Sequence, residues 1–137
     1  MPHVSGIVET SVYVTDLPRA AAFYRRVFDL ETLVESERLV ALGIAGRQVL
    51  LLFCAGLTNE PLETSGGVIP GHTGMVGSHF AFSIDAAEVA YWQERFRAEQ
   101  VEVESVVDWP KGGRSVYVRD PDGNLVELAT PGIWAVY

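Results

Sequence analysis

Apolar and polar residues alternate with different periods along the chain, and each change of period predicts a new element. Residues 6–14 mix apolar and polar positions in the manner of a strand. Asp16 can then cap a helix, and Pro18 suits its first turn. The apolar stripe of this amphipathic helix is formed by Phe23, Tyr24, Val27 and Phe28. Further strands are predicted at residues 31–35, 39–44 and 48–54.

The same order of elements restarts in the second half. A strand at residues 78–84 precedes a helix that Asp85 can cap, and a strand at 101–107 follows. The helix carries the pair Tyr91-Trp92 and then Phe96, at the spacing that Phe23-Tyr24 and Phe28 show in the first half. This is a degenerate repeat of about 70 residues, each copy reading β-α-β-β-β. The predicted fold class is α+β, built from two tandem modules.

The chain is expected to form a single domain, residues 1–137, with four parts. Module 1 covers about 5–55, a connector covers about 56–77, module 2 covers about 78–130, and an apolar tail covers 131–137. The connector is rich in Gly and Pro and is long for a plain connection, which favours a functional loop or a linker between modules. The tail is expected to dock on the body or on a partner subunit.

The stretch Asp120-Pro-Asp-Gly-Asn-Leu-Val-Glu-Leu128 is the strongest local signal. Its first half has the chemistry of a tight turn, and strand-like runs flank it, which predicts a β-hairpin. Glu127 lies inside the second strand on the same face as Leu125 and Ala129. A carboxylate on an apolar face needs a partner, and a metal ion is one candidate.

Composition narrows the possible partners. The formal net charge is −8 and the pI is about 4.7, which argues against a nucleic-acid or anionic-membrane surface. Cys54 is the only cysteine, so an intrachain disulfide is impossible. We found no signal peptide and no apolar run near the ~20 residues that span a bilayer, so the expected location is the cytoplasm.

The repeat places three candidate ligands on three strands. Glu9 and His79 precede the two capping aspartates by seven and six residues, so they occupy equivalent places on equivalent strands. Glu127 lies on the last strand of the second copy. One imidazole and two carboxylates suit Mn²⁺, Fe²⁺, Ni²⁺, Co²⁺ or Zn²⁺, and three protein ligands leave positions open for substrate.

An alternative interpretation separates these three residues. Glu9 would then lie at a solvated strand edge, His79 would be hydrogen-bonded in a core, and Glu127 would pair with an arginine such as Arg119.

The motifs resemble those of the vicinal oxygen chelate superfamily, which includes glyoxalase I, bleomycin- and fosfomycin-resistance proteins and extradiol dioxygenases. The resemblance rests on Glu9-x6-Asp16-Leu17-x5-Phe23-Tyr24, on Ser78-His-Phe-Ala-Phe82, and on the hairpin at 120–128. It implies curled mixed sheets that form a metal-binding cleft, commonly completed in a homodimer. It also implies that Glu9, His79 and Glu127 hold the metal.

Two departures from the family pattern bear on the chemistry. Glyoxalase I-like enzymes have a fourth ligand, a glutamate, on the last strand of the first module, where this chain has Leu51 or Leu52. Dioxygenases and fosfomycin enzymes usually begin with a histidine, where this chain has Glu9. The additional carboxylate favours harder ions such as Mn²⁺ or Fe²⁺.

Three neighbours complete the candidate site. Ser11 shares a strand face with Glu9 and is a candidate substrate contact. By similarity to the fosfomycin enzymes, Tyr117 faces the substrate and its hydroxyl can donate to an oxyanion; a half-buried strand aromatic is the alternative. Arg114 is a candidate contact for an anionic substrate.

The leading hypothesis is a divalent-metal enzyme with Lewis-acid chemistry on a small oxygen-chelating substrate, glyoxalase-like lyase or isomerase chemistry first. In this hypothesis Glu127 and Tyr117 are the catalytic residues. The alternatives are an Fe²⁺ extradiol-type dioxygenase, a thiol transferase of the fosfomycin-resistance kind, and a non-catalytic small-molecule-binding protein of the bleomycin-resistance kind.

Overall fold

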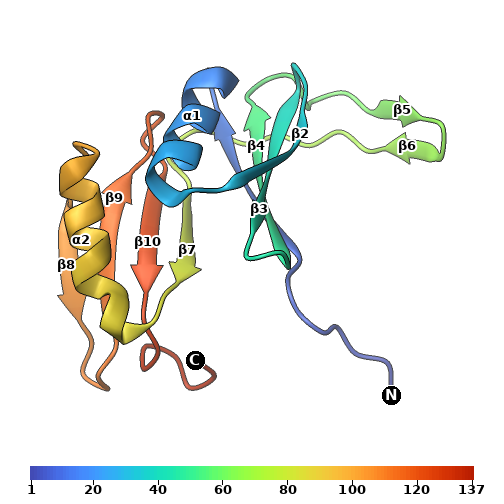
Figure 1. The fold of residues 1–137 in the computed structure, drawn as a ribbon. Helices are drawn as coiled ribbons and strands as arrows, with labels where there is room; N and C mark the ends of the chain where they lie inside the picture. The colour runs from blue at the N-terminus through green and yellow to red at the C-terminus, as the bar shows by residue number, and fades with distance from the viewer. The chain divides into compact units, whose positions relative to one another are not determined.

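The computed structural model describes all 137 residues, and the chain divides into two compact units, Met1–Val76 and Gly77–Tyr137 (Figure 1). The first unit contains β1 (Glu9–Val14), α1 (Leu17–Phe28), β2 (Glu31–Glu35), β3 (Leu39–Ile44), β4 (Gln48–Cys54), β5 (Leu62–Thr64) and β6 (Gly67–Ile69). The second contains β7 (His79–Ser83), the 3₁₀ helix η1 (Ala86–Glu88), α2 (Val89–Ala98), β8 (Ser105–Asp108), β9 (Arg114–Arg119) and β10 (Leu125–Ala129).

The two four-stranded sheets have the same topology. Their strand orders are β1-β4-β3-β2 and β7-β10-β9-β8. In each sheet the first strand of the module pairs in parallel with the last, and the other pairs are antiparallel. The predicted α+β class and the duplicated module are therefore confirmed. The shared cleft and the homodimer stay predictions.

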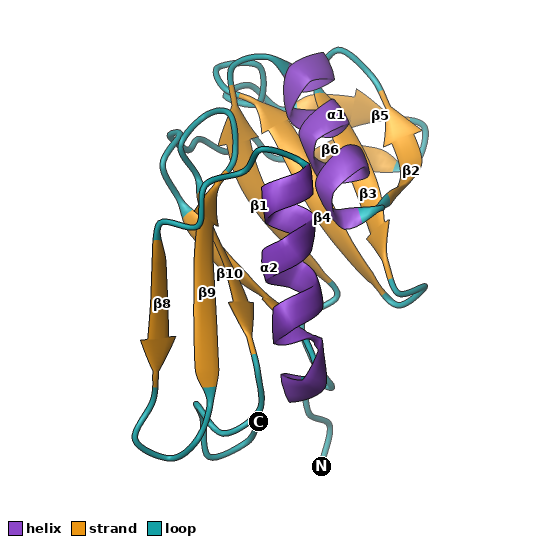
Figure 2. Cartoon of the chain, turned by 60° about the vertical axis from the view of Figure 1, so that its left-hand side comes forward, coloured by secondary structure: helices purple, strands orange, loops and turns teal.

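Helix α1 begins and ends as the sequence predicts. Asp16 accepts a hydrogen bond from the backbone N–H of Arg19 (3.0 Å), and Asp29 ends the helix in the left-handed region at φ 54°. The predicted stripe is buried, and Phe23 packs edge-on against Tyr24 with ring centroids 5.1 Å apart. The helix contacts β3 and β4 (Figure 2). It therefore covers one face of its sheet and leaves the opposite face for other uses.

Side chains alternate between the two faces of the second sheet. The buried face carries Phe80, Val116, Val118, Val126 and Leu128. Each side chain buried in this way contributes roughly 1.5–3 kcal/mol. Helix α2 runs along the direction of the strands of this sheet (Figure 1, Figure 2). His79, Tyr117 and Glu127 alternate onto the other face.

The turn at residues 120–124 determines where β7 starts. Asp120 Oδ1 accepts from the backbone N–H groups of Asp122 (2.9 Å) and Asn124 (2.8 Å). Asn124 is fully buried, and its Oδ1 accepts from the N–H groups of Gly77 and Ser78, both at 2.9 Å. The hairpin turn thus ties the first residues of the unit to the start of β10, which places the next residue, His79, beside β10.

Some predicted boundaries differ from the structure. Strand β1 starts at Glu9 instead of residue 6, and Ile7 and Val8 are 78% and 65% exposed. Strand β8 covers Ser105–Asp108, whereas 101–107 was predicted. The connector contains the β5–β6 hairpin, which the sequence pattern missed because each strand has only three residues.

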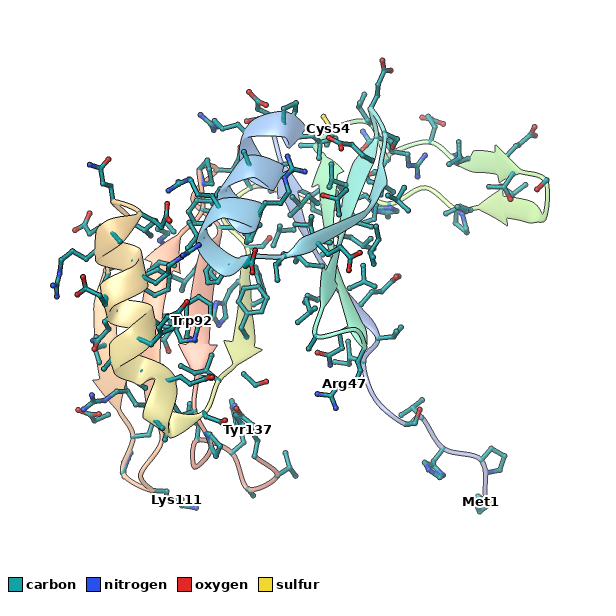
Figure 3. The ribbon with its side chains drawn as sticks, viewed as in Figure 1. Met1, Arg47, Cys54, Trp92, Lys111 and Tyr137 are labelled. Carbon is teal, nitrogen blue, oxygen red and sulfur yellow. The ribbon has the colours of Figure 1, made fainter.

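The tail folds back onto the second unit. The Tyr137 hydroxyl is within hydrogen-bonding distance of the carbonyl oxygens of Ala129 (3.1 Å) and Ile84 (3.3 Å) (Figure 3). The expected docking on the body is therefore observed for the last residue, while Trp134 is 70% exposed. Neither helix is long and apolar enough to cross a bilayer.

Candidate metal centre

His79 is held so that one ring nitrogen is available. Its Nδ1 lies 3.0 Å from the backbone carbonyl oxygen of Leu125, its register partner on β10. A carbonyl can only accept, so Nδ1 carries the proton and donates it. In the neutral ring Nε2 then has a free lone pair. Histidines that bind metal through one ring nitrogen commonly donate the N–H of the other to a backbone carbonyl in this way.

Glu127 is directed at that nitrogen. Its Oε1 lies 3.3 Å from His79 Nε2, and the residue is 9% exposed. Its other oxygen, Oε2, accepts from the hydroxyl of buried Ser115 (2.6 Å). Ser115 in turn accepts from the indole N–H of Trp109 (2.8 Å). Because an indole can only donate, the serine proton must point at the carboxylate, which fixes the orientation of Glu127.

The donor pair fits a divalent cation. A carboxylate oxygen and a bare ring nitrogen that face each other repel unless a positive charge compensates them. The 3.3 Å separation exceeds the 2.7–2.9 Å that is typical of a charge-assisted hydrogen bond. Two metal–ligand bonds of ~2.1 Å that meet at roughly 90–110° hold their donor atoms about 3.0–3.4 Å apart. The observed spacing lies in that range.

Arg119 is engaged elsewhere. Its guanidinium makes a bidentate ion pair with Glu104, at 2.7 Å and 3.1 Å. The hydrogen bond with Glu104 raises the pKa of Arg119. The partners of Glu127 are Ser115 and His79. The alternative in which Arg119 neutralises Glu127 is therefore not the arrangement in the structure.

The other predicted metal ligand belongs to the first unit. Glu9 and Ser11 lie on the same face of β1, and both are exposed. No three His, Cys, Asp or Glu side chains cluster as a ready metal site. His79 and Glu127 thus lie together, while their role as metal ligands and the convergence of Glu9 with them stay predictions.

The repeat identifies the counterpart of Glu127 in the first unit. Glu9 pairs with Val49 as His79 pairs with Leu125. Two residues further along β4 is Leu51, where β10 has Glu127. Of the two leucines considered from the sequence, the register selects Leu51, and a leucine cannot bind a metal.

Tyr117 and Arg114 lie in different surroundings. Tyr117 is the direct cross-strand partner of Glu127, and its ring centroid is 6.3 Å from that of His79. Arg114 is exposed and alternates onto the face of Val116, where its Nε donates to Asp108 (2.6 Å). This contact raises the pKa of Arg114. The structure therefore brings Tyr117 together with His79 and Glu127, but not Arg114.

The role of Ser115 was missed from the sequence. The signal was present, because the 120–124 turn sets the hairpin register and so places Ser115 opposite Ala129, diagonal to Glu127.

Comparison with known proteins identifies one matching family model and several similar proteins. A family model described as the Glyoxalase/Bleomycin resistance protein/Dioxygenase superfamily matches residues 6–128. Metallothiol transferase FosB of Bacillus licheniformis is 30% identical over 132 residues, which cover 96% of this chain and 79% of that protein.

Two solved structures are similar over most of the chain. Lactoylglutathione lyase from Agrobacterium tumefaciens is 40% identical with a TM-score of 0.87, and the match covers 96% of this chain and 98% of that one. The fosfomycin resistance protein FosX from Listeria monocytogenes, complexed with Mn(II) and sulfate, is 26% identical with a TM-score of 0.67, covering 93% and 91%.

Proposed function

The chain belongs to the Glyoxalase/Bleomycin resistance protein/Dioxygenase superfamily, and on that basis we propose that it is a divalent-metal-dependent enzyme with glyoxalase-like lyase or isomerase activity. The observation that carries the proposal is the 3.3 Å approach of His79 Nε2 to Glu127 Oε1. Both donors are oriented from behind, by Leu125 and Ser115 respectively. Glu9 is proposed as the third ligand. The similar FosX structure was solved with Mn(II), which supports a divalent ion of this class.

A bound ion supplies Lewis-acid stabilisation of a negatively charged substrate oxygen. The residues of the chain supply orientation and proton transfer. Tyr117, directly across the strand pair from Glu127, donates a hydrogen bond to that oxygen. Ser11 is proposed to contact the substrate from β1. If Glu9, His79 and Glu127 hold the ion, three protein ligands leave coordination positions of the metal open to substrate.

The proposed reaction is an isomerisation of the hemithioacetal that a thiol forms with a 2-oxoaldehyde. A proton leaves the carbon bearing sulfur and is returned to the adjacent carbonyl carbon. The hydroxyl proton of the first carbon is lost, and the second oxygen gains one, so a 2-hydroxy thioester forms without any external oxidant. Glu127 is the proposed carrier of the carbon-bound proton. The 40% identity to a lactoylglutathione lyase supports this class of reaction.

Metal content tests the proposal first. Protein purified without chelator is analysed for bound elements, and apo protein is titrated with Mn²⁺, Fe²⁺, Ni²⁺ and Zn²⁺. We expect binding, and we expect Glu127→Ala to lower the affinity at least tenfold. Glu102→Ala removes an exposed carboxylate of the same unit and serves as the control. No bound metal and no thermal shift with any of the four ions would instead favour the non-catalytic binding protein.

Turnover then distinguishes the reactions. Thiol-dependent loss of methylglyoxal in the metal-loaded protein supports the first proposal. Oxygen uptake on catechols with Fe²⁺ would support the dioxygenase alternative instead.

The leucine at position 51 favours a second candidate, the opening of an epoxide by a thiol. Leu51 occupies the register position of Glu127 in the first unit, so that strand offers no second carboxylate for proton transfer. Epoxide opening needs none: the thiolate forms a C–S bond, a C–O bond of the ring breaks, and the thiol proton ends on the new hydroxyl. The similarity to a metallothiol transferase supports this candidate. Its test is mass-spectrometric detection of a fosfomycin–thiol adduct.

A further inference from the structure

A groove of about 550 Å³ lies entirely within the first unit; none of the residues proposed to hold metal lines it, although its lining residue Val49 is the register partner of Glu9. Its walls come from the segment that joins α1 to β2 and from the loop that joins β3 to β4. The arrangement brings three charged side chains to one concave site: Asp29, Glu31 and Arg47. Arg47 lies at the end of the β3–β4 hairpin (Figure 3).

The floor of the groove is apolar. Phe28, Leu30, Leu33 and Val49 contribute to it. Gly43 leaves no room of its own, because a Cβ placed there would lie 3.3 Å from Leu33 Cδ2, closer than ordinary van der Waals contact. The apolar surface that a ligand side chain can cover is therefore the one that Leu33 and its apolar neighbours form.

The charges at the rim are not neutralised by one another. None of Asp29, Glu31 and Arg47 takes part in an ion pair. Arg47 makes a backbone turn bond to Ile44 (3.1 Å), and its guanidinium has no carboxylate partner. The groove thus offers one unpaired cation and two unpaired carboxylates over an apolar floor, an arrangement complementary to a ligand that carries both signs of charge.

The strand register sets the spacing of these charges. Glu31 pairs with Gly43, and Gly43 pairs with Val49, so two strand spacings separate Glu31 from β4. That distance is about 10 Å. Arg47 lies two residues before Val49 in the chain. A ligand whose ammonium and carboxylate are several ångströms apart, as in a dipeptide, spans this backbone separation better than a free amino acid, whose two charged groups share one carbon.

We propose that this groove binds a short zwitterionic peptide, with its carboxylate on Arg47, its ammonium between Asp29 and Glu31, and an apolar side chain on the floor. A guanidinium is suited to this task because its fork matches a carboxylate in two hydrogen bonds. The proposal requires no metal and is independent of the proposed enzymatic function.

Alanyl-leucine is the probe, titrated by NMR into the full-length protein in EDTA. Saturable shifts of groove residues are expected. N-acetyl-alanyl-leucine, alanyl-leucine amide and free leucine should each bind at least tenfold more weakly, because each lacks a charge or the required spacing. Working in EDTA separates this result from the metal experiments: metal binding can fail while the groove binds the peptide, and the reverse.

Two substitutions locate the site. Arg47→Gln and Glu31→Gln should each weaken binding at least tenfold; thermal melting verifies that each variant is folded. Glu37→Gln, an exposed acid outside the groove, is the control and should bind as the unmodified protein does. Absence of saturable shifts at 20-fold excess over about 1 mM protein, or binding that survives both charge substitutions, would overturn the proposal.

Discussion

The hydroxyl of Ser115 donates to Glu127 Oε2 over 2.6 Å, and this bond turns the remaining oxygen towards His79. Ser115 is itself oriented by Trp109, which lies in the connection between β8 and β9. Hydrogen bonds from Trp109 to Ser115 and from Ser115 to Glu127 therefore determine where the carboxylate points. Outer partners of this kind raise the affinity of a metal ligand by restricting its rotamers.

Ser115→Ala should therefore weaken metal binding by roughly 10–100-fold while Glu127 itself is retained. The variant should also lose about 1–3 kcal/mol of unfolding free energy, because buried Glu127 and the Trp109 indole each lose a partner. Calorimetric metal titration and urea denaturation measure the two effects. Ser105→Ala, at an exposed strand position of the same unit, is the matched control. Unchanged metal affinity in Ser115→Ala would show that Glu127 is not oriented for a metal.

Asn124→Ala should destabilise the second unit more than most single substitutions. The amide oxygen of Asn124 accepts from two backbone N–H groups, and its Nδ2 donates to Asp120 Oδ2 (2.9 Å). Removing this amide leaves the N–H groups of Gly77 and Ser78 and the Asp120 carboxylate without these hydrogen bonds where β7 meets β10. The free energy of unfolding should fall by about 2–4 kcal/mol. Urea denaturation measures the loss. Exposed Asn59→Ala should change stability by less than about 0.5 kcal/mol. A similarly small change in Asn124→Ala would contradict the positioning role of the turn.

The sequence predicted best those elements whose partners are local. The α1 stripe and the turn at 120–124 depend on residues within a few positions of one another, and both are found as predicted. The repeat predicted equivalent places on equivalent strands for Glu9 and His79, and the two modules do share one register. The pairing of β7 with β10, and the 3.3 Å between His79 and Glu127, required coordinates.

Contacts between distant segments could not be predicted. Arg119 was a reasonable partner for Glu127 by sequence, yet it binds Glu104, because Glu104 lies beside β9, with its N–H bonded to the Tyr117 carbonyl. No local sequence pattern indicates that Arg119 pairs with Glu104. The groove around Arg47 was missed for the same reason: its walls come from segments that the sequence analysis treated separately.

The ion pair between Glu104 and Arg119 predicts a pH-dependent contribution to stability. The hydrogen bond from Arg119 lowers the pKa of Glu104, burial opposes the shift, and the positive charge of Arg119 adds to it. Since the folded-state pKa lies below the unfolded one, the stabilisation is present above the ordinary glutamate pKa and is lost as the pH falls through the folded value. The stability difference between the unmodified protein and Glu104→Gln should therefore be larger at neutral pH than near about pH 3.

Chemical denaturation at the two pH values measures this difference, and added salt should reduce it, because both side chains are exposed. Exposed Glu102→Gln controls for the general loss of negative charge. An equal effect of Glu104→Gln at both pH values would show that the ion pair does not contribute.

Leu51→Glu tests whether the missing carboxylate determines the reaction. Leu51 occupies the register position that Glu127 holds in the second unit, on the strand face of Ser11, its cross-strand partner. The position is only half-buried, so a glutamate can be accommodated at a cost of about 1–3 kcal/mol.

If the first unit contributes to the metal site as proposed through Glu9, the new carboxylate should raise metal affinity at least tenfold. Leu51→Gln adds the same bulk without the charge and should not. Methylglyoxal isomerisation should rise relative to epoxide opening in Leu51→Glu alone, since a second carboxylate can assist the proton transfer between carbons and has no such step to assist in epoxide opening. Equal metal affinities of the Glu and Gln variants would place β4 outside the metal site.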